Sequence, residues 1–280
     1  MTQIIRSVER LRPMPTNVSR ILKALDDPFT TAQMVTDLIG LDQAIAAMVL
    51  QYANSAAMGY GGVCSSLLVA VMRLGFKRVK TILIGAAATG SINSSLSGYR
   101  LGAGVLWNHS IATASAALWI SRALGYPDPE EAYVAGLLHD MGKLLLDQYV
   151  QVDYHNIIEM MNQYGLLLWQ AEQKMFGIDH AGVGGLMAQK WNFPPVLIEA
   201  IRYHHSPSMA SEYARLAAIT NIANAVATRD EHGLNDPHGK VIHPESPVIL
   251  KLNEAGLDRI VKGVEAYLQI ENTANPDQKK

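Results

Sequence analysis

Hydrophobic residues recur at helical spacing along almost the whole chain. From Thr16 to Leu25, for example, the apolar side chains fall on one face of a helix. The same spacing predicts a helix from Thr30 or Thr31 and another from about Asp42. Further helices are predicted over residues 66–74, 76–90, 104–124, 129–146, 152–164, 167–177, 180–191, 195–204, 210–228 and 257–268. Because no series of alternating segments joined by hairpin turns occurs, the pattern predicts an all-α fold.

Two stretches interrupt the helical pattern. Residues 91–104 (SINSSLSGYRLGAG) are rich in Gly and Ser, which is typical of a junction between two bundles and equally of a surface loop inside one domain. Residues 229–248 hold three prolines, two glycines and no clear period, and therefore predict a long loop. A polar tail follows the last predicted helix.

Composition narrows the class of protein. Of the 280 residues, 49% are hydrophobic, so the chain can bury a large core. The formal net charge is −2, so the chain does not have the strong positive field of a protein that coats nucleic acid. The single cysteine, Cys64, excludes internal disulfides and cysteine-cluster metal sites. No apolar run approaches the roughly 20 residues of a membrane helix, and the start has charges where a signal peptide needs apolar residues. We expect a cytoplasmic protein.

The nine histidines fall into two groups. We expect His155, His232, His238 and His243 to be exposed, because they lie in polar or Pro/Gly-rich surroundings. The other five lie in apolar helical surroundings, where a polar ring needs a partner. They are His109, His139, His180, His204 and His205.

An aspartate follows one of these histidines directly. His139-Asp140 lies in the apolar segment AYVAGLLHDMGKLLL, and a buried carboxylate there is costly unless a cation, a metal or a hydrogen-bond donor compensates it. An isolated pair of this kind is most often a hydrogen-bonded structural feature. Five histidines in apolar surroundings together with Asp140 favour a shared site, and imidazole and carboxylate are ligands for Zn, Fe, Ni or Mn.

The order of these residues resembles that of the HD superfamily of metal-dependent phosphohydrolases, and LLHDMGK at 137–143 is similar to its central motif. Upstream, RPMPTNVSRILKALDDP, DQAIAAMVLQYANSAAMG and VMRLGFKRVKTILI resemble an HDOD domain, the branch associated with signalling. FGIDHAGVGGLMAQKWNFPPVLIEAIRYHHSP continues that resemblance, which runs from about Leu11 to Thr228. It implies an HD-type helical bundle at 104–228, a smaller N-terminal helical part at 11–90, and a closing loop, helix and tail at 229–280.

The resemblance also implies a metal site. One divalent ion would be held by His109, His139 and, weakly, Asn221, and a second by His180, His204 and His205, with Asp140 bridging the two. Lys143 would neutralise a phosphate in the same groove, although a lysine there is also typical of a solvated surface.

Two departures from the superfamily pattern bear on activity. Catalytic HD enzymes have a further Asp on a late helix, and the counterpart here is Asn221, or Asn224 if the register slips. The GYP-containing loop of cyclic-dinucleotide phosphodiesterases is missing after His204-His205, so we do not expect that activity.

Three functions compete at this point. The first is a regulatory protein that binds a protein partner in a signalling pathway, with Met34, Met48, Met58 and Met72 as an adaptable face or simply as core. The second is a phosphohydrolase that acts on a nucleotide or phosphomonoester. The third and weakest is nucleic-acid binding through Arg73, Lys77, Arg78 and Lys80, which no stacking aromatics accompany. We expect the first, with a nucleotide or phosphate as a second class of ligand.

Overall fold

The structure, a computed structural model, describes residues 1–11, 15–54, 64–89, 95–229 and 241–274. It divides the chain into two compact units, a small unit of residues 12–90 and a large unit of residues 1–11 and 91–280. Across these described ranges the chain is helical, apart from loops and one isolated antiparallel bridge between Leu96 and Leu101. The predicted all-α fold is therefore confirmed. None of the helices described has both the length and the apolar composition needed to cross a membrane.

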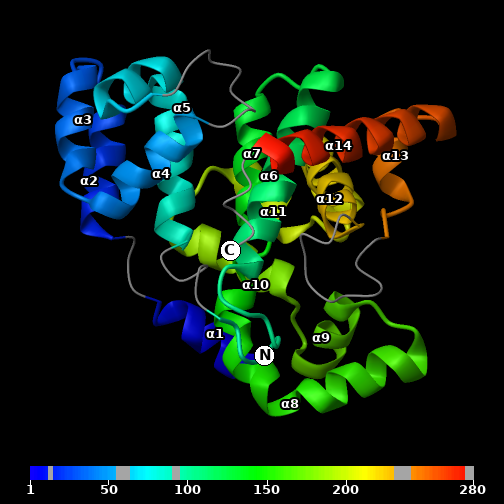
Figure 1. The fold of residues 1–280 in the computed structure, drawn as a ribbon. Coiled ribbons are helices and arrows are strands. Elements are labelled where there is room, and N and C mark those ends of the chain that lie inside the picture. Colours follow the sequence, from blue (N-terminus) through cyan, green and yellow to red (C-terminus); the bar gives the residue numbers. More distant parts are fainter. Residues whose placement is uncertain (12–14, 55–63, 90–94, 230–240, 275–280) are drawn as a thin grey trace. The chain divides into compact units, whose positions relative to one another are not determined.

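The small unit packs three short helices against a long one (Figure 1). Its helices are α2 (Thr16–Leu25), α3 (Ala32–Gly40), α4 (Gln43–Ala53) and α5 (Leu67–Thr89). The side chains of Thr31 and Asp42 begin α3 and α4 by accepting hydrogen bonds from backbone N–H groups of the first turn. Val35, Val49 and Val71 are fully buried where α5 meets its partners.

Gly75 divides α5 into two segments, as the sequence predicts. Its φ of 72° and ψ of 162° lie outside the helical region, and only glycine adopts that conformation readily. Nearby, Lys80 forms an ion pair with Asp26 at 2.5 Å. One of the four basic residues considered for nucleic-acid binding is thus compensated within the small unit.

The large unit is built around α6 and α12. Its helices are α1 (Thr2–Glu9), α6 (Val105–Ala123), α7 (Pro129–Leu138), α8 (Lys143–Tyr164), α9 (Leu168–Phe176), α10 (His180–Lys190), α11 (Pro195–Arg202), α12 (Ala214–Arg229), α13 (Glu245–Ile249) and α14 (Glu254–Ala274), with a 3₁₀ turn at Pro207–Met209. α12 packs against α6, α7 and α11, and α14 covers α6 and α12. Both helices carry fully buried alanines, among them Ala114, Ala116, Ala217 and Ala218, and such small side chains favour close helix packing.

Several predicted elements differ from the structure. The helix expected over 129–146 is wrong in its middle, because the chain leaves the helix after Leu138 and starts α8 at Lys143. α8 then runs on through the segment predicted as a separate helix at 152–164. The loop expected at 229–248 contains the start of α13, and His232 and His238 lie outside the described residues, as does Met58.

At Gly142, the last residue of the turn between α7 and α8, the chain packs closely on α10. A Cβ atom added there would lie 1.9 Å from the backbone oxygen of His180 and 2.6 Å from the backbone nitrogen of Gly184. The turn at 139–142 therefore rests directly on the backbone of α10. Hydrophobic periodicity continues through this turn, so it does not reveal the break.

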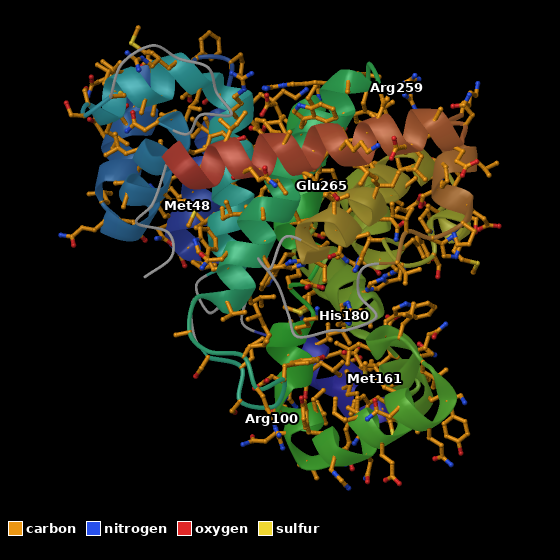
Figure 2. All side chains as sticks on the ribbon, turned by 45° about the vertical axis from the view of Figure 1, so that its right-hand side comes forward. Met48, Arg100, Met161, His180, Arg259 and Glu265 are labelled. Carbon is orange, nitrogen blue, oxygen red and sulfur yellow. The ribbon has the colours of Figure 1, made fainter. Side chains whose placement is uncertain are left out.

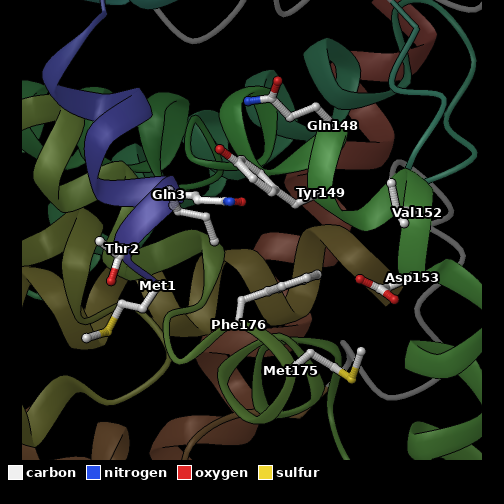
Figure 3. A pocket seen from close by; sticks show the side chains of 10 residues that line it. Met1, Thr2, Gln3, Gln148, Tyr149, Val152, Asp153, Met175 and Phe176 are labelled. Atoms are coloured by element: carbon white, nitrogen blue, oxygen red, sulfur yellow. The ribbon is translucent and has the colours of Figure 1, made fainter.

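The sequence analysis did not predict α1. Ile4 and Val8 are buried where this helix packs on α8 and α10, and Ser7 Oγ lies 2.8 Å from Tyr149 Oη. Between α1, α8 and the end of α9 runs a groove of about 550 Å³, which Met1, Gln3, Tyr149 and Phe176 help to line (Figure 3). Helix α1 is thus part of the large unit, although 79 residues of the small unit separate it from the rest in the sequence.

Candidate metal centre

Four helices of the large unit and the turns that follow them bring the predicted histidines and Asp140 together. His109 lies on α6, the pair His139-Asp140 in the turn after α7, and His180 at the start of α10. His204 and His205 follow directly after α11, which ends at Arg202 and not at residue 204 as predicted. His180 lies inside the unit (Figure 2), and of these six residues only His205 is partly exposed.

Close backbone contact between α6 and α7 sets the distance between His109 and His139. A Cβ atom at Gly136 would lie 2.8 Å from the Cα of Ala114. Glycine is thus the residue that allows the two helices to approach, and the two imidazole Nε2 atoms lie 3.3 Å apart as a result.

The donor atoms form two clusters, each within 4.8 Å. The first cluster is His109, His139 and Asp140, and the second cluster is His180, His204 and His205. In the second cluster, the Nε2 atoms of His180 and His205 lie 2.9 Å apart and the rings of His204 and His205 have centroids 4.0 Å apart. The structure therefore groups the histidines in the same way as the resemblance implied.

Asp140 lies between the two clusters. Its Oδ1 is 3.2 Å from Nε2 of His180, while its Oδ2 is 3.7 Å from Nε2 of His109 and 3.4 Å from Nε2 of His139. Lys143 donates to Oδ2 at 2.6 Å. Since Lys143 is only 3% exposed, the surface alternative for this lysine is wrong, and its ammonium group belongs to the site.

Three of the histidines donate a hydrogen bond from Nδ1 to a group outside the clusters. The backbone oxygens of Gly136 and Ile201 accept from Nδ1 of His139 and His204 at 2.7 and 2.8 Å, and Glu172 Oε2 accepts from Nδ1 of His180 at 2.6 Å. These bonds place a proton on Nδ1 and turn Nε2 of each ring toward the site, as in metal-ligating histidines.

Some buried atoms at the centre have no hydrogen-bond partner among the described residues. They are Nδ1 of His109, Oδ1 of Asp140 and Nε2 of His204. Unpartnered buried polar atoms cost free energy unless something else satisfies them. Imidazole and carboxylate lone pairs gathered in this way fit a divalent cation.

Burial and neighbouring charges shift the pKa values of these groups in different directions. Burial lowers the pKa of His109 to about 3, and it also lowers the pKa values of His204 and His205 well below 6.5. Burial alone would lower the pKa of His180 too, but the carboxylate of Glu172 overcomes it and raises that pKa to about 9. Although burial opposes its ionisation, His139 and Lys143 hold the pKa of Asp140 well below its usual value. At neutral pH, before an ion binds, His109, His204 and His205 are thus neutral, Asp140 is ionised and His180 is protonated, so an ion at the second cluster would have to displace the proton from Nε2 of His180.

The two asparagines of α12 have different surroundings. Asn221 donates from Nδ2 to the backbone oxygen of His204 at 2.8 Å, and its Oδ1 accepts from the backbone nitrogen of His243 and from Ser246 Oγ. The preferred candidate therefore already uses the oxygen that it would offer to an ion. Asn224, one turn later, acts against the lowering of the pKa of His109 by burial, and it also lines the cavity next to the second cluster.

Sequence reasoning missed four residues around the clusters. Glu172 is fully buried and Tyr99 donates to it at 2.7 Å, while Trp169 stacks on His205 with a centroid distance of 5.6 Å. His243, expected to be exposed and without a role, is half-buried beside Asn221. Of the four, only Glu172 could have been suspected from the sequence, because it is an acidic residue in the segment that leads to His180.

A cavity opens next to the second cluster. Its volume is about 290 Å³, and its lining includes Trp169, His205, Asn224 and His243. Because aromatic, amide and imidazole groups share this wall, the cavity can receive a small polar ligand that reaches the histidines.

Comparison with protein families gives one match, a model described as the HDOD domain, over residues 11–207. Among curated proteins, the "Uncharacterized protein" of Treponema pallidum (strain Nichols) is 26% identical over 219 residues, which cover 78% of this chain and 42% of that protein. The chain thus spans about two fifths of the length of this relative.

Three solved structures are similar over nearly the whole chain. An HDOD domain protein with unknown function from Geobacter sulfurreducens is 25% identical, with a TM-score of 0.67 and coverage of 99% of this chain and 94% of its own. A "Putative phosphohydrolase" from Shewanella amazonensis SB2B is 23% identical, with a TM-score of 0.71 and coverage of 96% and 97%. A "Putative signal transduction protein" from Marinobacter aquaeolei VT8 is 21% identical, with a TM-score of 0.70 and coverage of 97% and 60%. The last two likenesses show the fold.

Proposed function

The chain belongs to the HDOD family, and we propose that it is a regulatory, signal-transduction protein that keeps an HD-type metal site in its large unit. The observation that carries the proposal is Asp140, a buried carboxylate with one oxygen toward each histidine cluster. Similarity to the "Putative signal transduction protein" from Marinobacter aquaeolei VT8 supports a signalling role. In this proposal the helical part at 11–90 receives a partner, and the bundle at 104–228 holds the metal.

The donor set fits one or two divalent ions such as Fe, Mn, Zn or Ni. His109, His139 and Asp140 would hold one, with Asn224 beside them, and the second cluster with Asp140 Oδ1 would hold the other. A bound ion supplies Lewis-acid polarisation of phosphoryl oxygens and an acidified water. Lys143 keeps Asp140 ionised and adds a positive charge next to it.

The charge of the site suits it to binding an anion. Asp140 is the single carboxylate within the two clusters, and Lys143 already balances its charge. Because α12 contributes neutral asparagines, the full charge of a bound ion remains available to an anion. A site of this kind holds a nucleotide or phosphate as a regulatory ligand.

The second candidate function is hydrolysis of a nucleotide or phosphomonoester. The cavity of about 290 Å³ beside His205 favours it, because it offers room for a ligand in reach of the histidines and of Trp169. In this alternative Asp140 and Lys143 are the catalytic residues. Phosphate release by the metal-loaded protein, abolished in Asp140→Ala, would establish it. If no nucleotide or generic phosphate ester is cleaved, only the regulatory function remains.

Exposed apolar side chains of the small unit support a protein partner. Phe29 is 87% exposed, Met34 51% and Met72 66%, whereas Met48 is half-buried. Exposed apolar side chains that gather on one face of a domain mark protein-binding surfaces. We expect Met34→Glu/Met72→Glu to abolish capture of the partner and to leave the metal content unchanged.

Elemental analysis tests the metal site directly. Protein purified without chelators is compared with His139→Ala/Asp140→Ala. We expect near-stoichiometric metal in the wild type and its loss in the variant. Wild-type protein that contains no metal and takes none up on reconstitution would contradict the proposal.

A further inference from the structure

The two halves of the metal site differ in what orients their histidines. Backbone oxygens accept from His139 and from His204, but a carboxylate, that of Glu172, accepts from His180. Glu172 lies on α9 and is fully buried, eight residues before His180. Within the described residues around the two clusters, this is the one histidine whose Nδ1 is held by a charged side chain.

Glu172 has a partner for each carboxylate oxygen. Its Oε2 accepts from the backbone nitrogen of His180 at 2.8 Å and from Nδ1 at 2.6 Å, so it holds both the start of α10 and the ring. Its Oε1 accepts from the hydroxyl of Tyr99 at 2.7 Å. Tyr99 is in turn fixed through its backbone nitrogen, which donates to Asp147 Oδ1 on α8.

We propose that Glu172 is a positioning residue for the metal site: through its bonds to His180 it orients Nε2 of that ring, through its negative charge it makes the ring a stronger metal ligand, and it thereby sets the metal affinity of the second cluster, while Tyr99 positions Glu172. This inference rests on the proposed metal site. Carboxylates that accept from a ligating histidine typically change metal affinity about 10–100-fold when removed. The first cluster has no bond to Glu172 among those described, so its affinity should not depend on it.

The test is a Co²⁺ titration, followed by the absorption of the bound ion, on single-cluster backgrounds. His109→Ala leaves the second cluster, and His205→Ala leaves the first. Glu172→Gln is nearly isosteric, and its amide can still accept from His180 while its NH₂ group donates to the Tyr99 oxygen, so the fold is kept. Glu159→Gln, an exposed glutamate on α8, is the matched control.

We expect Glu172→Gln to weaken Co²⁺ binding about 10–100-fold in the His109→Ala background and to leave it unchanged in the His205→Ala background. Tyr99→Phe should give a smaller loss in the same background. Equal affinities with and without Glu172→Gln, or equal losses in both backgrounds, would overturn the inference. Wild-type protein that binds no Co²⁺ would instead overturn the proposed metal site itself.

Discussion

The substitution Gly142→Ala tests whether the turn at 139–142 must touch α10. The added Cβ would lie 1.9 Å from the backbone oxygen of His180, and ordinary contact begins at 3.4 Å. The two backbones must therefore separate by about 1.5 Å. The atoms in the way belong to the backbone and cannot rotate aside, so we expect a cost of about 3 kcal/mol in the free energy of unfolding.

The same displacement should affect the metal site. Asp140 Oδ1 and His180 Nε2 lie 3.2 Å apart. Two ligands of one ion, each at about 2.1 Å from it, lie no more than about 4.2 Å apart. A shift of about 1.5 Å would widen the separation of 3.2 Å to about 4.7 Å, beyond that limit, so Asp140 should no longer share an ion with the second cluster.

Urea unfolding in EDTA measures the stability, and Co²⁺ titration measures the site. Gly102→Ala is the control in the same unit, because the nearest atom to its added Cβ is Val105 Cγ2 at 3.8 Å. The reasoning fails if Gly142→Ala unfolds at the wild-type urea concentration, or if it binds Co²⁺ with wild-type affinity and stoichiometry.

Three more predictions follow from single residues. The pKa of His109 is about 3 in the folded protein and 6.5 in the unfolded chain, so only the unfolded state takes up the proton as the pH falls below 6.5. The contribution of His109 to the free energy of unfolding is therefore complete above pH 6.5 and falls by about 2 kcal/mol between pH 6.5 and 5. Urea unfolding at both pH values measures this loss, and equal stabilities at the two pH values would contradict it. Asn224→Asp should tighten Co²⁺ binding at the first cluster at least about tenfold. Asn221→Asp should instead lower the free energy of unfolding by about 1–3 kcal/mol, because it loses the donor to the backbone oxygen of His204. Tighter Co²⁺ binding by Asn221→Asp and not by Asn224→Asp would show that Asn221 is the residue of α12 beside the ion. Gly75→Ala should lower the thermal stability of the small unit by about 1–3 kcal/mol because φ is 72°, while Gly40→Ala, with open space around it, should not.

Most helices could be predicted from the sequence because their signals are local. Apolar spacing found α2, α6 and α10 within a residue or two, and the capping side chain of Thr31 and the break at Gly75 were readable in advance. The turn at 139–142 could not be predicted in this way, because the apolar pattern continues through it and its close contact is with the backbone of α10, some 40 residues away.

In the candidate site, too, local features could be predicted from the sequence and contacts between distant segments could not. The residue types, an Asp among histidines in apolar segments, were enough to suggest a metal, and resemblance supplied the grouping. Burial of Lys143 was decided by the short turn that folds it back onto Asp140. The choice between Asn221 and Asn224 depends on how α12 is rotated against α6 and on what its side chains already bind.

The sequence by itself thus determined the helical class, the family and the ligand chemistry, because helical periodicity and residue type are properties of short segments. Only the tertiary structure decided that Asp140 has one oxygen toward each cluster and that Glu172 holds His180. These relations join residues from helices far apart in the chain, and their distances are set by the packing of whole helices, to which no local pattern corresponds.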